Sequence, residues 1–308
     1  MNKLKKLRKI FKIYKLDGYI VPKNDEFFGE YVDEGHDRLK YISSFSGSAG
    51  YAIILRNNSY LFVDGRYTLQ AKKESGKNFK IIEIHKSKPS KILSKILIKI
   101  KIGFDPKLFS EANLIKNFKT RNTSLIPIEQ NLIDKIWSNR PKTKIKKFFL
   151  LNSKHAGRNY KNKLNTVCKI LKKRKINKLL ITAPENLAWL LNIRGKDSKY
   201  SPLPNCHAIL DNKKKITLIV NEKKINNKFK QHFKNIINYI NPSHINKYLD
   251  NLDHKKFFLI DKFSCSYFYK KLIEKRFLYD EKNDPIYILK AKKNNVEISN
   301  SIKSHILD

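Results

Sequence analysis

The chain has 308 residues, of which 66 are Lys or Arg and only 27 are Asp or Glu, so its formal net charge is +39. A hydrophobic content of 41%, with 15 Tyr and 18 Phe, excludes a disordered chain, and the length allows two domains with their own cores. No apolar run approaches the roughly 18 residues that span a bilayer. The N-terminus has no uninterrupted apolar run and no small-residue cleavage site, so we expect no secretory signal. Three distant cysteines (Cys168, Cys206 and Cys265) offer neither a disulfide framework nor a zinc site, so we expect a cytoplasmic protein with no membrane partner.

The first half of the chain predicts alternating helices and strands. Apolar residues recur at helical spacing from Leu4 to Tyr14 with basic residues between them, which predicts an amphipathic helix. Such a helix usually packs on a sheet, although a membrane-surface helix or a transit peptide has the same pattern. The elements predicted next are a strand at 19–21, a hairpin within 52–64, a helix at 68–75, strands at 80–84, 102–106 and 125–128, and helices after Pro89 and Ser110.

A second unit repeats the first in outline. A helix at 160–174 leads to a strand at 179–182, as the N-terminal helix leads to the strand at 19–21. The segments AIILRNNSYLFVD (52–64) and AILDNKKKITLIVN (208–221) share the order strand, polar turn, strand. We therefore predict an α/β protein of two related domains, each a mixed sheet with flanking helices. The predicted domains are residues 1–143 and 144–286, followed by a third segment at 287–308.

The last segment, 287–308, predicts a linker followed by a charged helix at about 292–306. Val296, Ile298, Ile302 and Ile306 give this helix apolar positions whose packing partner is expected outside the two domains. Exposed apolar surface of this kind favours association. We expect removal of 287–308 to leave both domains folded and to improve solubility.

The net charge has two explanations. A positive field is expected of a protein that binds nucleic acid or an anionic membrane. Mutational drift toward Lys, Asn and Ile gives the same composition without such a function. Arginine, which makes paired contacts to phosphate, accounts for only ten of the 66 basic residues, and the lysines are spread through every segment. We favour drift and expect only salt-sensitive, nonspecific binding to polyanions.

Metal and nucleophile motifs are weak. The eight histidines are scattered, and the densest group of candidate ligands, at 34–37 (Glu-Gly-His-Asp), is predicted to cap a helix rather than to hold an ion. Gly47-Ser48-Ala49-Gly50 lacks the spacing of a serine nucleophile elbow and the Lys-Ser/Thr ending of a P-loop. We interpret it as a structural turn, with a small anion-binding nest as the alternative.

Arg66 is the residue that the sequence singles out. Six of the ten glycines precede residue 66, and Gly65 follows the apolar run 61–63 and Asp64. Glycine allows a positive φ or the close approach of another group, so a turn at this point would aim the arginine from a rigid strand. The alternative is a surface arginine paired with Asp64, which contributes little to stability.

Several segments in succession resemble the Xaa-Pro aminopeptidases (aminopeptidase P, of the creatinase/prolidase superfamily). They fall in family order across nearly the whole chain and are similar to the first two domains of the longer, three-domain form. The segments are YIVP (19–22), GEYV (29–32), the glycine turn at 45–50, VDGRYTLQA (63–71), GFDP (103–106), NLIDKIWSNRP (131–141), HAG (155–157), NLAWLLNIRG (186–195) and SPLP (201–204).

The resemblance implies a hydrolase family whose chemistry resides in a third, "pita-bread" domain. There, two Asp, one His and two Glu hold two divalent metals, usually manganese, whose bridging hydroxide attacks the Xaa–Pro bond. Residues 287–308 resemble the entry into that domain, and Asp280, Asp284 and Asp308 match none of its ligands. The resemblance therefore implies no metal site, no catalytic residue and no cofactor in this chain. Arg66 matches the substrate-contacting arginine of the family's DGRY motif, whereas His207 stands where the family usually has an aromatic residue.

Three functions follow. The first is the non-catalytic N-terminal part of a Xaa-Pro aminopeptidase, inactive alone, which positions proline-containing peptides as a homodimer or beside a separately encoded catalytic domain. The second is a retained, non-enzymatic module for peptide binding or dimerisation. The third is a basic nucleic-acid-binding protein, against which the even spread of lysines argues, so we expect no specific nucleic-acid partner. A downstream reading frame for a metal-binding domain would separate the first two.

Overall fold

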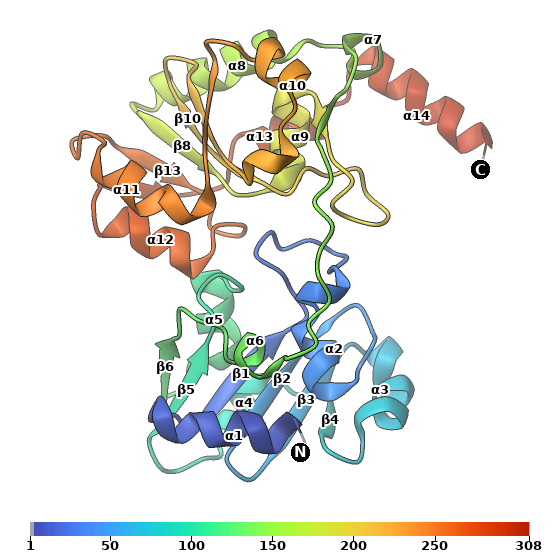
Figure 1. Ribbon diagram of the computed structural model, residues 1–308, viewed down its shortest axis with the longest axis vertical. Helices are drawn as coiled ribbons and strands as arrows, with labels where there is room; N and C mark the ends of the chain where they lie inside the picture. Colours follow the sequence, from blue (N-terminus) through green and yellow to red (C-terminus); the bar gives the residue numbers. More distant parts are fainter. Residues whose placement is uncertain (1–2, 308) are drawn as a thin grey trace. The chain divides into compact units, whose positions relative to one another are not determined.

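The structure is a computed structural model that describes residues 3–307 (Figure 1). The chain divides into two compact units, and the division falls between Thr143 and Lys144. Each unit is built on a six-stranded mixed sheet with helices on both faces. The predicted fold class is therefore confirmed.

The first unit begins with a helix, after which strands and helices follow one another along the chain. Its strands are β1 (Gly18–Pro22), β2 (Gly50–Leu55), β3 (Ser59–Val63), β4 (Lys80–Glu83), β5 (Ile100–Phe104) and β6 (Thr123–Pro127). Its α-helices are α1 (Lys3–Ile13), α2 (Arg38–Ser43), α3 (Thr68–Ser75), α4 (Pro89–Leu93), α5 (Glu111–Phe118) and α6 (Leu132–Ile136), and its 3₁₀ turns are η1 (Glu34–His36) and η2 (Gly65–Tyr67).

The first sheet has the strand order β4-β3-β2-β1-β5-β6. The β1–β2 and β2–β3 pairs are antiparallel, whereas β3–β4, β1–β5 and β5–β6 are parallel. Helices α1, α2 and α6 pack on one face of this sheet against alternate residues of β1, β2 and β3. On the other face, Phe118 of α5 contacts Tyr51 of β2 edge to face. Because successive side chains of a strand point to opposite faces, the sheet contributes residues to two cores, one on each face.

The amphipathic N-terminal helix belongs to the first of these cores. Leu4, Leu7 and Phe11 are buried on α1, at most 5% exposed, which confirms the packing interpretation of this helix. Within residues 3–307, no helix is long and apolar enough to cross a membrane.

The second unit repeats the same plan. Its strands are β7 (Phe149–Leu150), β8 (Lys178–Ile181), β9 (Ile193–Arg194), β10 (His207–Asp211), β11 (Ile216–Ile219), β12 (Ile237–Ile240), β13 (Phe258–Ile260) and β14 (Tyr279–Glu281). Its helices are α7 (Ser153–Ala156), α8 (Tyr160–Lys173), α9 (Pro184–Leu191), η3 (Glu222–Lys224), α10 (Asn227–His232), η4 (Pro242–His244), α11 (Ile245–Asp250), α12 (Tyr267–Glu274), α13 (Ile286–Ala291) and α14 (Asn295–Leu307).

The second sheet has the order β12-β11-β10-β8-β13-β14, and its parallel and antiparallel pairs match those of the first sheet position for position. Helices α8 and α9 cover one face, and α11 and α12 cover the other. Strands β7 and β9 form a separate two-stranded sheet that the sequence did not predict. The repeat inferred from the segments 52–64 and 208–221 is thus a repeat of the whole sheet topology.

The C-terminal helices both contact the second unit. Leu289 of α13 packs against the core that α8 and α9 cover, where the sequence predicts a linker. Before α14, Asn294 donates a hydrogen bond to the carbonyl of Ala156 at 3.0 Å and accepts from the amides of Val296 and Glu297. Asn294 therefore caps α14 and joins it to α7 at the same time. Removal of residues from 287 onward would also delete Leu289, so a shortened chain should end after Ala291.

Gly157 makes this joint possible. Its φ is +65°, and a Cβ at this position would lie 2.1 Å from the Asn294 side-chain oxygen. Replacement of Gly157 by Ala should cost roughly 1–2 kcal/mol for the left-handed backbone and displace Asn294 from its cap. We expect faster amide hydrogen exchange over α14 and a lower unfolding midpoint in urea. Gly29→Ala is the control, because a Cβ there meets no atom closer than 3.8 Å. Equal exchange in both variants would contradict the role of this joint.

Candidate functional site

The turn after β3 positions Arg66. Val63 ends the strand fully buried, and the Asp64 carboxylate then accepts a hydrogen bond from the Arg66 amide at 3.0 Å, which caps the turn η2. Gly65 lies against Glu83, whose carboxylate would be 3.3 Å from a Cβ at this position. A buried strand, a cap and a close approach therefore fix the backbone from which the arginine projects.

The Arg66 side chain is 73% exposed and lies over its own turn. Its Nε donates to Asp64 Oδ1 at 2.8 Å, and its guanidinium lies over the Tyr67 ring, 5.5 Å from the centroid. The His85 ring nitrogen lies 3.6 Å from the other oxygen of Asp64. The hydrogen bond from Arg66 holds the pKa of the Asp64 carboxyl below its ordinary value. Arg66 is thus exposed and paired with Asp64, as one interpretation of the sequence has it, and a role in substrate binding stays a prediction.

The glycine turn at 47–50 lies beside this arginine. Ser48 Oγ and the Tyr67 hydroxyl are 2.8 Å apart, which joins the two turns. A Cβ on Gly47 would lie 2.2 Å from the Phe45 ring, and one on Gly50 would lie 2.7 Å from a carbonyl oxygen of β3. Close approach explains both glycines, as the structural interpretation of this turn requires.

A buried arginine, Arg38, is the feature of this unit that the sequence analysis missed. It is 3% exposed, and its guanidinium donates to both oxygens of Asp134 at 2.9 and 3.0 Å and to Glu26 at 2.9 Å. Burial alone would lower the pKa of Arg38, but the charges of Glu26 and Asp134 outweigh it and hold the pKa above its ordinary value. Arg140 adds a second cation to Asp134 at 2.8 Å.

The Arg38 cluster joins α2, α6 and the loop after β1. Its partners lie 12 and 96 residues away in the sequence, so spacing gives no sign of it. One signal was available. Arginine is rare in this lysine-rich chain, and paired contacts to a carboxylate are the contacts that lysine cannot reproduce.

Candidate metal ligands are used for other purposes. Within residues 3–307, no three His, Cys, Asp or Glu side chains come together as a metal site requires. In the group at 34–37, Asp37 caps α2 by accepting from the Lys40 amide and pairs with Lys23. Asp33 caps η1 in the same way. The helix-capping interpretation of this group is therefore confirmed. The described residues do not fit a di-metal centre.

Comparisons with known proteins agree with this architecture. Two models described as the creatinase/prolidase N-terminal domain match the chain in succession, over residues 3–136 and 139–297. The chain belongs to the creatinase/prolidase family. The Xaa-Pro aminopeptidase 1 of Dictyostelium discoideum is 33% identical over the full length of this chain and 51% of its own. The Xaa-Pro aminopeptidase ApepP of Drosophila melanogaster is 33% identical over 95% of this chain and 49% of its own.

A solved structure shows the same fold. The X-prolyl aminopeptidase of Caenorhabditis elegans, described as a cytosolic enzyme with a di-nuclear active site, matches 96% of this chain with a TM-score of 0.87 and 24% identity. The match covers 52% of that enzyme. The chain therefore spans about half the length of the relatives it matches.

The two arginines should behave differently when they are removed. Arg38→Ala leaves the charges of Asp134 and Glu26 without their main partner, so we expect a loss of roughly 3–5 kcal/mol in the free energy of unfolding. Arg66→Ala breaks an exposed pair, and the expected change is within about 0.5 kcal/mol. Urea titration followed by circular dichroism measures both. A stable Arg38→Ala protein would show that the cluster contributes little, and severe loss in Arg66→Ala would assign Arg66 a structural role.

Proposed function

We propose that this chain is the non-catalytic N-terminal part of a Xaa-Pro aminopeptidase of the cytoplasm, a family of metallo-exopeptidases that release the residue before proline. In this proposal it positions the peptide and contributes to dimerisation, and it has no peptidase activity alone. The observation that carries the proposal is the succession of two N-terminal family domains over residues 3–297, which correspond to about half the length of the aminopeptidases.

In this proposal the peptidase chemistry belongs to a separate catalytic part. A pair of divalent metals would polarise the scissile carbonyl and supply hydroxide, and residues 3–307 offer no matching ligand group. The catalytic part would lie on the same polypeptide or on a separately encoded one. The contribution of this chain is then to hold and orient the peptide.

Arg66 is the proposed peptide contact. Its guanidinium is exposed on a turn that a buried strand and a cap hold in place. Paired N–H donors suit a peptide carbonyl or carboxylate, and Asp64 and Tyr67 hold the side chain near one orientation. Exchange of Asp64 for a substrate oxygen would cost little, since the pair is exposed to water.

A second candidate is a retained binding or dimerisation module without a catalytic partner. Exposed apolar residues on α14 would support association, because Ile298 is 45% exposed, Ile302 56% and Ile306 76%. Association through α14 would be common to both candidates. Peptidase activity in the presence of a catalytic domain separates them.

Pure chain should show no cleavage of a Xaa-Pro peptide in the presence of manganese and should bind no stoichiometric metal. The reason is the missing ligand group, without which no bound water is activated. Release of the N-terminal residue measures activity, and equilibrium dialysis with elemental analysis measures bound metal. Manganese-dependent cleavage that a chelator abolishes would contradict the proposal.

A fusion to the C-terminal half of the Dictyostelium relative tests Arg66 directly. We expect Arg66→Ala to lower turnover of a Xaa-Pro peptide by the equivalent of roughly 1.5–3 kcal/mol, the value of a hydrogen bond to a charged group. Arg66→Lys is the matched variant, because it keeps the charge without the paired donors. The parent fusion must be active for the comparison. Unchanged turnover in both variants would exclude a substrate contact, and an inactive parent fusion would favour the second candidate.

A further inference from the structure

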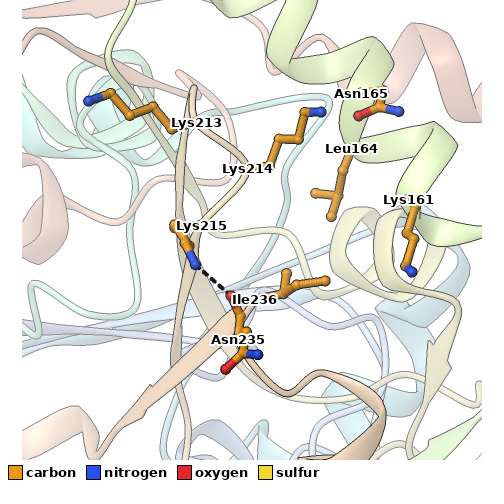
Figure 2. Close-up of a pocket in the computed structure, with 8 residues that line it drawn as sticks. All are labelled: Lys161, Leu164, Asn165, Lys213, Lys214, Lys215, Asn235 and Ile236. Carbon is orange, nitrogen blue, oxygen red and sulfur yellow. Dashed lines mark hydrogen bonds between the residues drawn. The ribbon is translucent and has the colours of Figure 1, made fainter.

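A cavity in the second unit is lined by three separate segments, two of which contribute lysines. It has a volume of about 320 Å³, and Figure 2 shows the side chains around it. One wall is the first part of α8, another is the turn between β10 and β11, and the third is the turn before β12. The lining residues are Lys161, Leu164, Asn165, Lys213, Lys214, Lys215, Asn235 and Ile236.

The lining carries four positive charges and no negative one. The nearby carboxylate of Asp211 is already engaged, because it accepts from Lys178 Nζ at 2.9 Å and from the Lys213 amide at 2.7 Å. Leu164 and Ile236 give the cavity an apolar part, and Asn165 and Asn235 add side-chain amides. Lysines on both sides of a concave surface focus the positive field there.

The walls are held by backbone hydrogen bonds. The amide of Asp211 donates to the carbonyl of Lys215 at 2.8 Å, which closes the turn between β10 and β11. The Ile216 amide donates to the Ile236 carbonyl at 2.9 Å, and Lys215 Nζ donates to the Asn235 carbonyl at 2.6 Å. These bonds join the two turns, so the lysines extend from a fixed frame. Figure 2 shows Lys213 extending away from Leu164, whereas Lys214 extends toward the α8 wall.

We propose that this cavity binds an oligophosphate group. Lys161 and Lys214 extend from two different walls, and Lys215 adds a third cation whose ammonium also donates to the Asn235 carbonyl. Such a set matches an anion with several charges rather than a single carboxylate, and lysine binds phosphate as a point charge. The volume lies at the lower end of the range of ligand pockets, roughly 300–1,000 Å³. The group could belong to inorganic tripolyphosphate or to a nucleoside triphosphate, whose base would use the partly exposed apolar surface of Ile236.

The test compares two double variants of the same charge. Lys161→Gln with Lys214→Asn removes one cation from each of two walls. Asn suits position 214, because the φ of Lys214 is +70° and Asn tolerates this region better than other residues do. The control is Lys247→Gln with Lys255→Gln, two exposed lysines of the same unit that do not line the cavity. Circular dichroism melts establish that both variants are folded.

Isothermal titration with tripolyphosphate, and separately with ATP without magnesium, is carried out on the 308-residue chain at 150 mM salt, which screens diffuse attraction. We expect saturable one-to-one binding that the cavity variant weakens at least tenfold and the control changes less than twofold. Tighter binding of ATP would identify a nucleotide as the source of the phosphate, whereas equal or weaker binding of ATP would show that the base contributes nothing and that the site recognises the phosphate chain alone. Equal weakening in the two variants, or titration without saturation, would overturn the proposal. Peptidase activity enters none of these measurements, so this test and that of the proposed function fail independently.

Discussion

The constraint on which both units depend is that each sheet is covered by helices on both faces. Central strands such as β1, β8 and β11 are therefore buried along their whole length. A chain with 66 basic residues must place nearly all of them on outer helix faces, in turns and at strand ends. A charge that enters the interior must be paired or hydrogen-bonded, since desolvation is otherwise too costly. Lys163 obeys this rule: it is 1% exposed, and its Nζ donates to the Trp189 carbonyl and to Asn192. Burial lowers its pKa to about 8.

The same constraint explains why lysine and arginine occupy different kinds of position in this chain. Eight of the ten arginines donate hydrogen bonds to a named partner in the structure. The buried Arg38 makes a paired contact with the partly buried Asp134, and Arg8 joins a carbonyl of β2 to Ser59 of β3. Drift toward lysine on the surface has a small energetic effect, because exposed charges interact weakly. Replacement of a planar, five-donor group at a buried site is expensive. Arginine in this chain therefore marks positions where hydrogen-bond geometry matters.

Local pattern was sufficient to predict the strands of the first sheet and three strands of the second (β8, β10 and β11), but it predicted neither β12, β13 and β14 nor the sites. Apolar strands bounded by turns, and caps such as Ser110, are encoded within a few residues, so those elements and the repeat were predictable. The Arg38 cluster depends on Asp134, which is 96 residues away in the sequence. Helix and strand periodicities relate only residues that are close in sequence, so they could not predict this pair. The lysine cavity is similar. Lysines are evenly spread along the chain, but the fold brings residues 161, 213–215 and 235 to one surface. Even distribution in sequence is thus compatible with local concentration in space.

The internal repeat separates the structural part of the candidate site from its chemistry. In the first unit β3 is followed by η2, where Asp64 accepts from the Arg66 amide; in the second, β11 is followed by η3, where Asn221 accepts from the Lys223 amide. The two turns have the same cap, the same 3₁₀ geometry and a basic residue at the same step. The cap therefore belongs to the fold, because it ends the equivalent strand in both units. The guanidinium belongs to the first unit alone: Lys223 keeps the charge at the equivalent position but lacks the paired donors that would hold a peptide oxygen. A function assigned to Arg66 consequently rests on its side chain and on the groups beside it, Asp64 and Tyr67, and not on the turn that presents it.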